Sequence, residues 1–323
     1  MADQPSAAQF DWDRPELAHL VRSALEEDIG PRDATVAALI SSSANARARI
    51  VAKQDLVIAG LPLVERVFRN LDPNVSFSAE CAEGSRARPG DRVASLSGHT
   101  AAILSGERTA MNFLAHLCGV ATSAHKYVQA MAGTKARLRD TRKTTPLLRA
   151  LEKYAVRCGG GTNHRFGLYD AILIKENHIA AAGSIGEALR RARAWSTCQA
   201  VPQGGQRHAD RAMTAYESYE PPRAASPSAA IPIQIEVRNE AELREALEAQ
   251  ADSVLLDNLS PAECARLATL VRAIRPACTV EASGGIDLAT VRAYAESGVD
   301  FISVGALTHS APAADLSLLV ELP

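Results

Sequence analysis

The second half of the chain repeats one short unit, and this repeat limits the fold more than any other feature. From about residue 137 onward, short apolar runs alternate with segments of helical periodicity, and a charged residue or a glycine stands near the end of most runs. The runs are ARLRD (136–140), AILIK (171–175), IQIEV (233–237), SVLLD (253–257), TVEAS (279–283) and FISVG (301–305). Apolar strands that lack strict alternation, each followed by a helix, indicate a parallel sheet buried on both faces.

The polar and glycine residues of this repeat gather where the strands end. In a closed (β/α) barrel, the active site lies at the carboxyl ends of the strands. In an open doubly wound sheet, ligands bind at the same edge. The repeat therefore predicts an α/β protein with its site at this edge, and it leaves open whether the sheet closes.

The part of the chain before residue 106 follows a different pattern. Short β-like runs with Gly and Pro turns flank a helix expected over 61–70, which is typical of a small α+β domain. Further helices are expected over 17–27 and 110–131. We expect residues 1–15 to form a frayed arm.

One segment interrupts the repeat. Residues 196–231 are rich in Pro, Ser, Ala and Gly. A structureless loop of more than about 15 residues is usually functional or disordered. We expect a mobile insertion here, with a partner-binding loop as the alternative.

Composition excludes several classes of function. The chain has 35 Lys and Arg against 37 Asp and Glu, and this net charge of −2 argues against a broad nucleic-acid-binding surface. Aromatic residues make up only 4%, which weakens any interpretation based on base stacking. No apolar run approaches the roughly 20 residues that span a membrane, and the N-terminus resembles neither a signal nor a transit peptide. Because the six cysteines are scattered without a CxxC pair, we expect reduced thiols and a cytoplasmic protein.

The densest cluster of reactive side chains lies between residues 140 and 175. Its cations stand near strand ends, where Arg offers a planar fork and Lys a point charge to carboxylate or phosphate. Three consecutive glycines let the backbone approach a ligand closely or adopt a positive φ. Single cations could instead pair with nearby acids, but a lysine that closes an apolar run needs a function or a partner. The cluster contains Asp140, Arg142, Lys143, Lys153, Arg157, Gly159 to Gly161, Asn163, His164, Arg165 and Lys175.

Two carboxylates form a second candidate site. Glu236 and Asp257 stand at the ends of successive expected strands, so they should be neighbours on one edge. Such a pair can hold Mg²⁺, accept hydrogen bonds from sugar hydroxyls or stabilise a developing cation. The alternative is that both acids pair with the cations of the first cluster.

Glycine turns follow the last two strands. Loops at this place in a barrel commonly bind phosphate through backbone N–H groups, although a glycine can also serve only a tight turn. The two turns are Ser283-Gly284-Gly285 and Val304-Gly305-Ala306.

Several long segments resemble the quinolinate phosphoribosyltransferase family. The block from DTRKT (140–144) to KENH (175–178) is long and highly specific, whereas EDIGPRDAT (27–35) resembles the family's N-terminal motif more loosely. Other matching segments are GERTAMNFLAHLCGVAT (106–122), SVLLDN (253–258) and the stretch from EASGG to DLSL (281–318). The resemblance spans nearly the whole chain except the arm and the insertion.

This resemblance implies a two-domain fold and an activity. It implies an N-terminal open α/β sandwich over 1–112, completed by 308–323, that packs on an incomplete (β/α) barrel over 113–307. Members of the family act as homodimers, and the partner's N-terminal domain completes each site. Their reaction joins quinolinate to phosphoribosyl pyrophosphate (PRPP) and gives nicotinate mononucleotide, CO2 and pyrophosphate, with Mg²⁺.

The matching motifs also imply roles for single residues. The residues expected to bind quinolinate are Arg142, His164, Arg165 and Lys175, with Thr141 in the same motif and Arg108 arriving from the neighbouring subunit. Lys143 and Lys175 are expected to face the pyrophosphate of PRPP, and Glu236 and Asp257 to hold the ribose hydroxyls and Mg²⁺. These four are the expected catalytic residues. The residues expected to bind the 5-phosphate are Ser283, Gly284, Gly285, Val304, Gly305 and Ala306.

Two positions depart from the family pattern. Gln234 stands where the family often has a further Glu, and we expect Glu236 to keep the functional place. Glu176 replaces the more usual Asp after the lysine, which is a small change.

Three other interpretations compete with this one. The molybdenum-transport-associated relative of the family would share the phosphoribosyl site but take another acid, whereas the intact set of cations favours a dicarboxylate. A barrel aldolase would use Lys175 as a Schiff base. A metabolite-binding or scaffold protein would use the insertion as an interface, and the carboxylate pair and phosphate turns argue against it.

Overall fold

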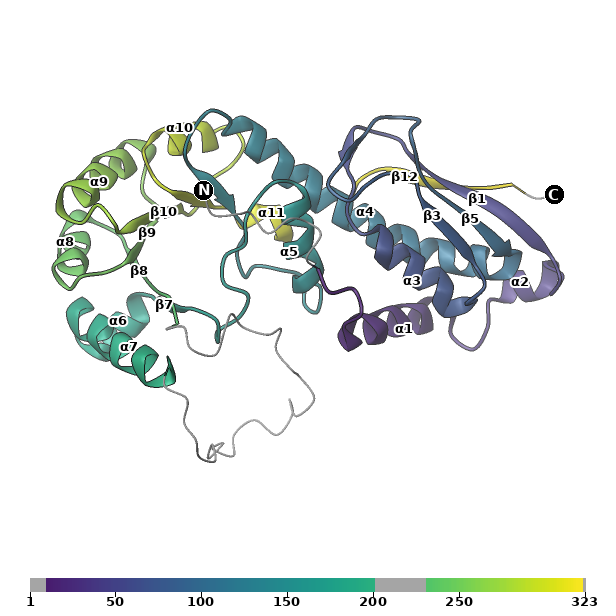
Figure 1. Ribbon diagram of the computed structural model, residues 1–323, viewed down its shortest axis with the longest axis horizontal. Helices are drawn as coiled ribbons and strands as arrows, with labels where there is room; N and C mark the ends of the chain where they lie inside the picture. Colours follow the sequence, from purple (N-terminus) through teal and green to yellow (C-terminus); the bar gives the residue numbers. More distant parts are fainter. Residues whose placement is uncertain (1–9, 201–230, 322–323) are drawn as a thin grey trace.

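A computed structural model describes residues 10–200 and 231–321 of the chain. It has two parts, an antiparallel sheet covered by helices and a parallel sheet with helices around it, and helix α4 (Thr100–Ala130) runs between them (Figure 1). The α/β fold class with an N-terminal sandwich and an incomplete barrel is therefore confirmed.

The N-terminal part is a four-stranded antiparallel sheet with helices on one face (Figure 1). Its strands, in spatial order, are β12 (Leu316–Glu321), β1 (Asn45–Ala52), β5 (Arg92–His99) and β3 (Ser76–Ala79). The other elements of this part are α1 (Pro15–Ile29), α2 (Ala34–Leu39), α3 (Leu61–Leu71), β2 (Leu56–Val57) and β4 (Arg86–Ala87). Because β12 comes from the end of the chain and pairs with β1, the last strand belongs to the first sheet.

Helix α4 begins ten residues before the start that the sequence suggested. Gly106, which precedes the helix expected over 110–131, lies inside α4. A Cβ atom at Gly106 would come within 3.0 Å of side-chain atoms of both Phe68 and Leu71 on α3, so this glycine allows the two helices to pack closely. The expected boundary between residues 112 and 113 falls within this single helix, and the division into domains stays a prediction.

The C-terminal part is a six-stranded parallel sheet. In spatial order its strands are β6 (Arg137–Arg139), β11 (Phe301–Ser303), β10 (Thr279–Ser283), β9 (Ser253–Asp257), β8 (Ile233–Val237) and β7 (Ile172–Ile174). Strands β8, β9 and β10 coincide with the runs expected from the sequence. Within the described residues β6 and β7 do not pair, and Thr162 extends the β6 edge by one parallel bridge to Arg139.

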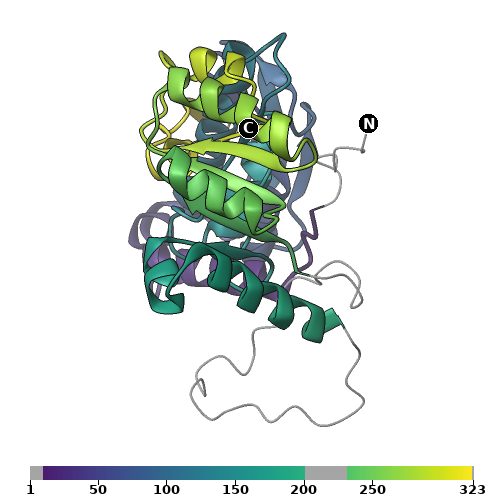
Figure 2. The same ribbon diagram turned by 90° about the vertical axis from the view of Figure 1, so that its left-hand side faces the viewer.

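Helices α6 (Glu176–Ala182), α7 (Ile185–Ala200), α8 (Glu240–Glu248) and α9 (Pro261–Ile274) cover the outer face of this sheet, toward the viewer in Figure 2. The other helices of this part are α10 (Val291–Glu296) and, packed against α4 between the two parts in Figure 1, α5 (Arg149–Cys158) and α11 (Ala306–His309). The strands are buried between these helices and the interior, which explains their continuous apolar runs.

Two expectations about irregular segments need correction. The frayed arm is wrong for residues 10–15, because the rings of Phe10 and Trp12 each lie 4.9 Å from the ring of Tyr154 and helix α1 begins at Pro15. The pairing of aromatic rings compensates for the entropy lost in ordering this segment. The expected insertion also starts too early, since α7 continues to Ala200. Residues 201–230 and the rest of that expectation lie outside the described residues.

The described cysteines are separate thiols. They are Cys81, Cys118, Cys158, Cys264 and Cys278, and no disulfide joins any of them. In the portion of the chain with described coordinates, no helix is long and apolar enough to cross a membrane.

Candidate active site

A cavity of about 580 Å³ opens at the carboxyl ends of the parallel strands. Its walls come from the loops after β6, β7, β8, β9, β10 and β11, so one edge of the sheet supplies nearly all of its polar groups. The sequence-predicted residues that line it are Thr141, Arg142, Lys143, His164, Arg165, Lys175, Glu236, Asp257, Ser283, Gly284, Gly285, Val304, Gly305 and Ala306. The parallel sheet thus brings together segments that lie up to 165 positions apart in the chain, as the hydrogen bond between Thr308 and Lys143 also shows.

Arg108 is the exception among the predicted site residues. It lies on α4 with an exposed side chain and does not line the cavity of its own subunit.

One wall of the cavity carries three cations that are not joined to acids by salt bridges among the described residues. Within the described ranges, Arg142, Lys143 and Arg165 form no salt bridge, and Nε of Arg142 is buried without a hydrogen-bond partner. Burial lowers the pKa of Arg165, and the neighbouring charge of Arg142 lowers it further. Because like charges are held together in a partly buried wall, an anion placed there would relieve their repulsion.

The opposite wall carries the two predicted carboxylates. Glu236 and Asp257 end adjacent strands β8 and β9, and both face the cavity. Oε2 of Glu236 lies 3.2 Å from Nζ of Lys175, while Oδ2 of Asp257 accepts a hydrogen bond of 2.9 Å from the Asn258 side chain. Glu236, and not Gln234, is therefore the residue of β8 that reaches the cavity.

Lys175 differs from the buried lysine that the apolar run suggested. It follows β7 at the rim, and half of its side-chain surface is exposed. A Schiff-base lysine is activated by desolvation or by a neighbouring cation, whereas Lys175 is half exposed and contacts a carboxylate. This geometry argues against the aldolase interpretation.

The glycine turn after β10 has a conformation that requires glycine. Gly284 has a φ of +102°, and a Cβ atom there would come within 2.2 Å of Oδ1 of Asn258. Gly285 also has a positive φ, of +62°. The turn after β11 is different, because Gly305 has an ordinary φ and lies close to the Lys143 and His309 side chains. Both turns expose backbone at the cavity wall.

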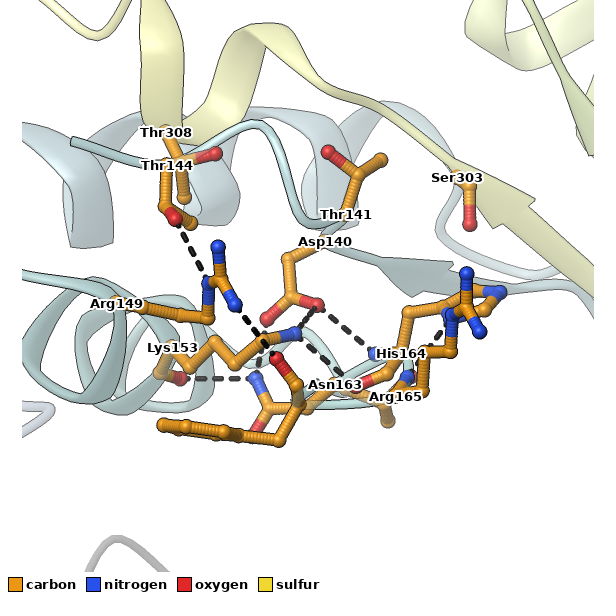
Figure 3. Close-up of polar contacts among 12 residues, drawn as sticks. Asp140, Thr141, Thr144, Arg149, Lys153, Asn163, His164, Arg165, Ser303 and Thr308 are labelled. Carbon is orange, nitrogen blue, oxygen red and sulfur yellow. Dashed lines mark hydrogen bonds and ion pairs between the residues drawn. The ribbon is translucent and has the colours of Figure 1, made fainter. Parts of the chain in front are cut away.

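A buried ion pair supports the cationic loop from beneath (Figure 3). Nζ of Lys153 lies 2.5 Å from Oδ1 of Asp140, and both side chains are almost fully buried. Asp140 also accepts hydrogen bonds from the Asn163 side chain and from the main-chain N–H of His164. Burial raises the pKa of Asp140 and lowers the pKa of Lys153, so desolvation works against the charges that their contact stabilises.

Two cations and the glycine triplet do not belong to the anion pocket, contrary to the expectation from the sequence. Lys153 forms an ion pair with Asp140, and neither Lys153 nor Arg157 lines the cavity. A Cβ atom at Gly159 would come within 2.3 Å of the main-chain oxygen of Ala121, so this glycine lets α5 end against α4. Gly160 has a φ of +89°, and the triplet as a whole serves packing and a turn.

Sequence reasoning missed several residues of the cavity wall. They are Leu173, Leu255, Asn258, Glu281, Ile286, Ser303 and His309. Glu281 is the most informative of them, because it lies in the middle of the apolar run TVEAS and is 1% exposed. An acid inside an otherwise apolar strand needs a buried partner. That position was therefore a recognisable signal.

Both halves of the chain match models of one protein family. The family model for the quinolinate phosphoribosyl transferase N-terminal domain matches residues 33–118, and the model for the C-terminal domain of the same family matches residues 120–202 and 207–319.

Curated relatives match over almost their whole length. A probable nicotinate-nucleotide pyrophosphorylase [carboxylating] of Bacillus subtilis is 39% identical over 307 residues, which cover 95% of this chain and 94% of the relative. The human nicotinate-nucleotide pyrophosphorylase [carboxylating] is 36% identical over 304 residues, which cover 94% and 91%. The solved structure of the nicotinate-nucleotide pyrophosphorylase from Francisella tularensis superposes with a TM-score of 0.81 at 34% identity, covering 99% of this chain and 100% of that one.

Proposed function

This chain belongs to the quinolinate phosphoribosyltransferase family, and on that premise we propose how its cavity divides the reaction among its residues. The enzyme transfers the phosphoribosyl group of PRPP to quinolinate with decarboxylation, giving nicotinate mononucleotide, CO2 and pyrophosphate. The observation that carries the assignment to this cavity is its unpaired cationic wall, which faces a pair of carboxylates across a space of about 580 Å³.

The cationic wall binds quinolinate. Arg142 and Arg165 offer planar donors to the two substrate carboxylates, and Lys175 stands at the rim between this wall and Glu236. Arginine forks hold carboxylates through paired hydrogen bonds, which orient the pyridine ring as well as retain it. An orientation that directs the ring nitrogen at the ribose supplies part of the rate enhancement.

The carboxylate wall binds and activates the phosphoribosyl group. When pyrophosphate leaves C1 of the ribose, positive charge develops on the sugar, and the carboxylates of Glu236 and Asp257 stabilise it. Lys143 neutralises charge on the leaving pyrophosphate, and the backbone of the two glycine turns accommodates the 5-phosphate. The pyridine nitrogen becomes cationic once it carries the ribose. When the bond between the adjacent ring carbon and its carboxylate breaks, CO2 leaves, the ring cation stabilises the electron pair left on that carbon, and the carbon takes a proton from water. No protein nucleophile is needed.

Glu236 and Asp257 also suit Mg²⁺, although they do not form a complete metal site. Among the residues whose positions are described, no group of three His, Cys, Asp or Glu side chains could hold a metal ion. Mg²⁺ is usually held by one or two carboxylates together with substrate phosphates and water, so this pair fits an ion that arrives with PRPP. A bound Mg²⁺ would supply charge neutralisation at the pyrophosphate.

The enzyme works as a cytoplasmic homodimer with shared sites. The five free thiols suit a reducing compartment. Arg108 supports the shared site, because it is exposed on α4 and lies outside the cavity of its own subunit. Its guanidinium would add a donor for quinolinate to the partner's cavity.

Mixing two inactive variants tests this sharing. Arg108→Ala subunits mixed with Lys175→Ala subunits form mixed dimers in which one of the two sites keeps both residues. With random exchange, half of the dimers are mixed, so activity should return to about a quarter of the native rate in a two-fold symmetric assembly. Native mass spectrometry would verify the exchange. An inactive mixture with verified exchange would contradict the shared site.

An assay with two acids tests the function itself. The enzyme is incubated with PRPP, Mg²⁺ and ring-labelled quinolinate, and labelled nicotinate mononucleotide is measured; nicotinate replaces quinolinate in a parallel reaction. We expect product from quinolinate alone, since the arginine wall is built for two carboxylates. If neither acid gives product while calorimetry detects PRPP binding, the proposed acid substrate is wrong and the molybdenum-associated relative becomes the better assignment.

A further inference from the structure

A chain of hydrogen-bonded polar side chains crosses the parallel sheet, and three of its members, His164, Glu281 and Ser303, line the cavity. Glu281, at the centre of β10, accepts a hydrogen bond of 2.7 Å from Nη1 of Arg139, whose guanidinium stacks 3.3 Å from the centre of the Phe301 ring. Glu281 also accepts from the Ser303 hydroxyl. The buried Glu281 carboxylate thus accepts from both a cation and a hydroxyl.

Gln234 links Glu281 to His164. Its side-chain Nε2 donates to Oε2 of Glu281 at 3.0 Å, and its Oε1 lies 3.0 Å from Nε2 of His164. An ionised carboxylate only accepts hydrogen bonds, so the amide must turn its NH2 group to Glu281 and its oxygen to His164. Nε2 of His164 must then carry the proton.

The other ring nitrogen of His164 leads to the same tautomer. Nδ1 lies 2.7 Å from the main-chain N–H of Arg165 and accepts a hydrogen bond from it. A protonated Nδ1 would meet another donor there. The chain of donors therefore runs in one direction, from Arg165 N–H through His164 and Gln234 to Glu281.

Charged groups surround His164 on every side. Glu281 lies 3.5 Å from Nε2, with Arg139 behind it. Lys153 on α5 donates to the His164 carbonyl, and Asp140 accepts from its N–H (Figure 3). Burial lowers the pKa of His164, and Arg139 and Lys153 add to the shift, while Glu281 and the hydrogen bond with Gln234 oppose it. A neutral ring agrees with the hydrogen-bond pattern.

We propose that Gln234 is a positioning residue for the acid subsite, which holds His164 as the neutral Nε2–H tautomer and so fixes the main chain at Arg165. The charge of Glu281 determines which way the Gln234 amide is turned. The amide in turn favours the tautomer of the His164 ring that carries its proton on Nε2. The amide donates to the carboxylate and accepts from the imidazole at the same time; a methyl group or an ionised carboxylate in its place could not do both. This inference rests on the proposed binding of quinolinate at Arg142 and Arg165.

The first test measures directly which nitrogen of the His164 ring is protonated. The protein is labelled with 15N-histidine, and the His164 signals are identified as those lost in the His164→Gln variant. From about pH 6 to pH 8, we expect Nε2 to be protonated and Nδ1 to remain unprotonated, against the titration usual for a free imidazole. If His164 in the native protein carries its proton on Nδ1, or is protonated on both nitrogens, the proposal is overturned regardless of the results for the variants.

The second test removes the amide. In Gln234→Leu, Nε2–H loses its acceptor while the N–H of Arg165 still favours an unprotonated Nδ1, so we expect shifted or broadened ring signals from a loosely held ring. We also expect a KM for quinolinate that rises about fivefold, with the KM for PRPP unchanged. Gln234→Asn, whose amide is too short to reach both partners, should act in the same direction and serves if the leucine variant does not fold. Native ring signals, or an unchanged KM for quinolinate, in a folded variant would overturn the proposal.

Ser303→Ala is the matched control. It removes a different hydrogen bond from the same Glu281 carboxylate without touching His164. We expect its ring signals to match those of the native protein. A changed tautomer in this variant would mean that any disturbance of Glu281 has the same effect, and it would overturn the specific role of Gln234. The ring signals are measured without substrate, so a protein that forms no nicotinate mononucleotide would refute the proposed function while leaving the tautomer test intact.

Discussion

Replacing Lys153 by Met is expected to lower the free energy of unfolding by about 3–5 kcal/mol. The methionine fills most of the same volume but leaves the carboxylate of Asp140 fully buried without its cation. The two remaining donors, the side chain of Asn163 and the N–H of His164, do not neutralise its charge. Because Asp140 holds the loop that carries His164, the loss should also loosen the cavity wall.

Urea unfolding followed by circular dichroism measures this loss. Lys126→Met provides the matched control, since Lys126 is exposed on α4 and should change the unfolding free energy by less than about 0.5 kcal/mol. The double variant Asp140→Asn with Lys153→Met should recover part of the loss, because it removes the unpaired charge. A loss of under about 1 kcal/mol for Lys153→Met would show that the pair contributes no more than a surface salt bridge.

Replacing Arg142 by Ala is expected to raise the KM for quinolinate by about 100-fold while the KM for PRPP stays within about twofold. Arg142 faces the cavity with no salt bridge to any described residue, and its Nε is buried without a partner, so its donors are free for the substrate. Removing a charge-assisted hydrogen bond of this kind costs more than removing one between neutral groups.

Steady-state kinetics with each substrate varied in turn separates the two effects. Arg142→Lys keeps the charge but not the planar fork, and it should recover only part of the affinity for quinolinate. Arg137→Ala is the control, since Arg137 is exposed at the opposite end of β6 from the cavity. Equal increases in both KM values for Arg142→Ala would contradict the assignment of Arg142 to the acid subsite.

Many residues at the carboxyl ends of the parallel strands, where the cavity opens, could be predicted from sequence. The end of a strand can be recognised from a few neighbouring residues along the chain. The runs IQIEV and SVLLD have strand boundaries that match the structure, and their acids then face one cavity by the topology of a parallel sheet. The same logic placed Lys175 and the two glycine turns. Long motifs such as DTRKT identified the family, which was confirmed by the match to both domains.

The direction in which a polar side chain points was harder to predict. Arg142 and Lys153 looked alike as cations of one cluster, yet Arg142 faces the cavity and Lys153 is buried against Asp140. Gly159 belonged to the triplet expected to approach a ligand or form a turn, yet it allows α5 to end against α4. In each case the deciding contact comes from another element of the fold, which a local pattern does not reveal.

The sequence by itself determined the parallel sheet, its strands and the edge that carries the chemistry, because apolar runs and the residues after them depend on neighbours along the chain. Only the tertiary structure decided which cations stay unpaired, and it alone revealed the path from Arg139 through Glu281 and Gln234 to His164. Arg139 and Glu281 lie 142 positions apart, and Gln234 and His164 lie 70 apart. Contacts over such distances arise from the way the strands are ordered in the sheet, and they set the charge and hydrogen bonding of each buried group.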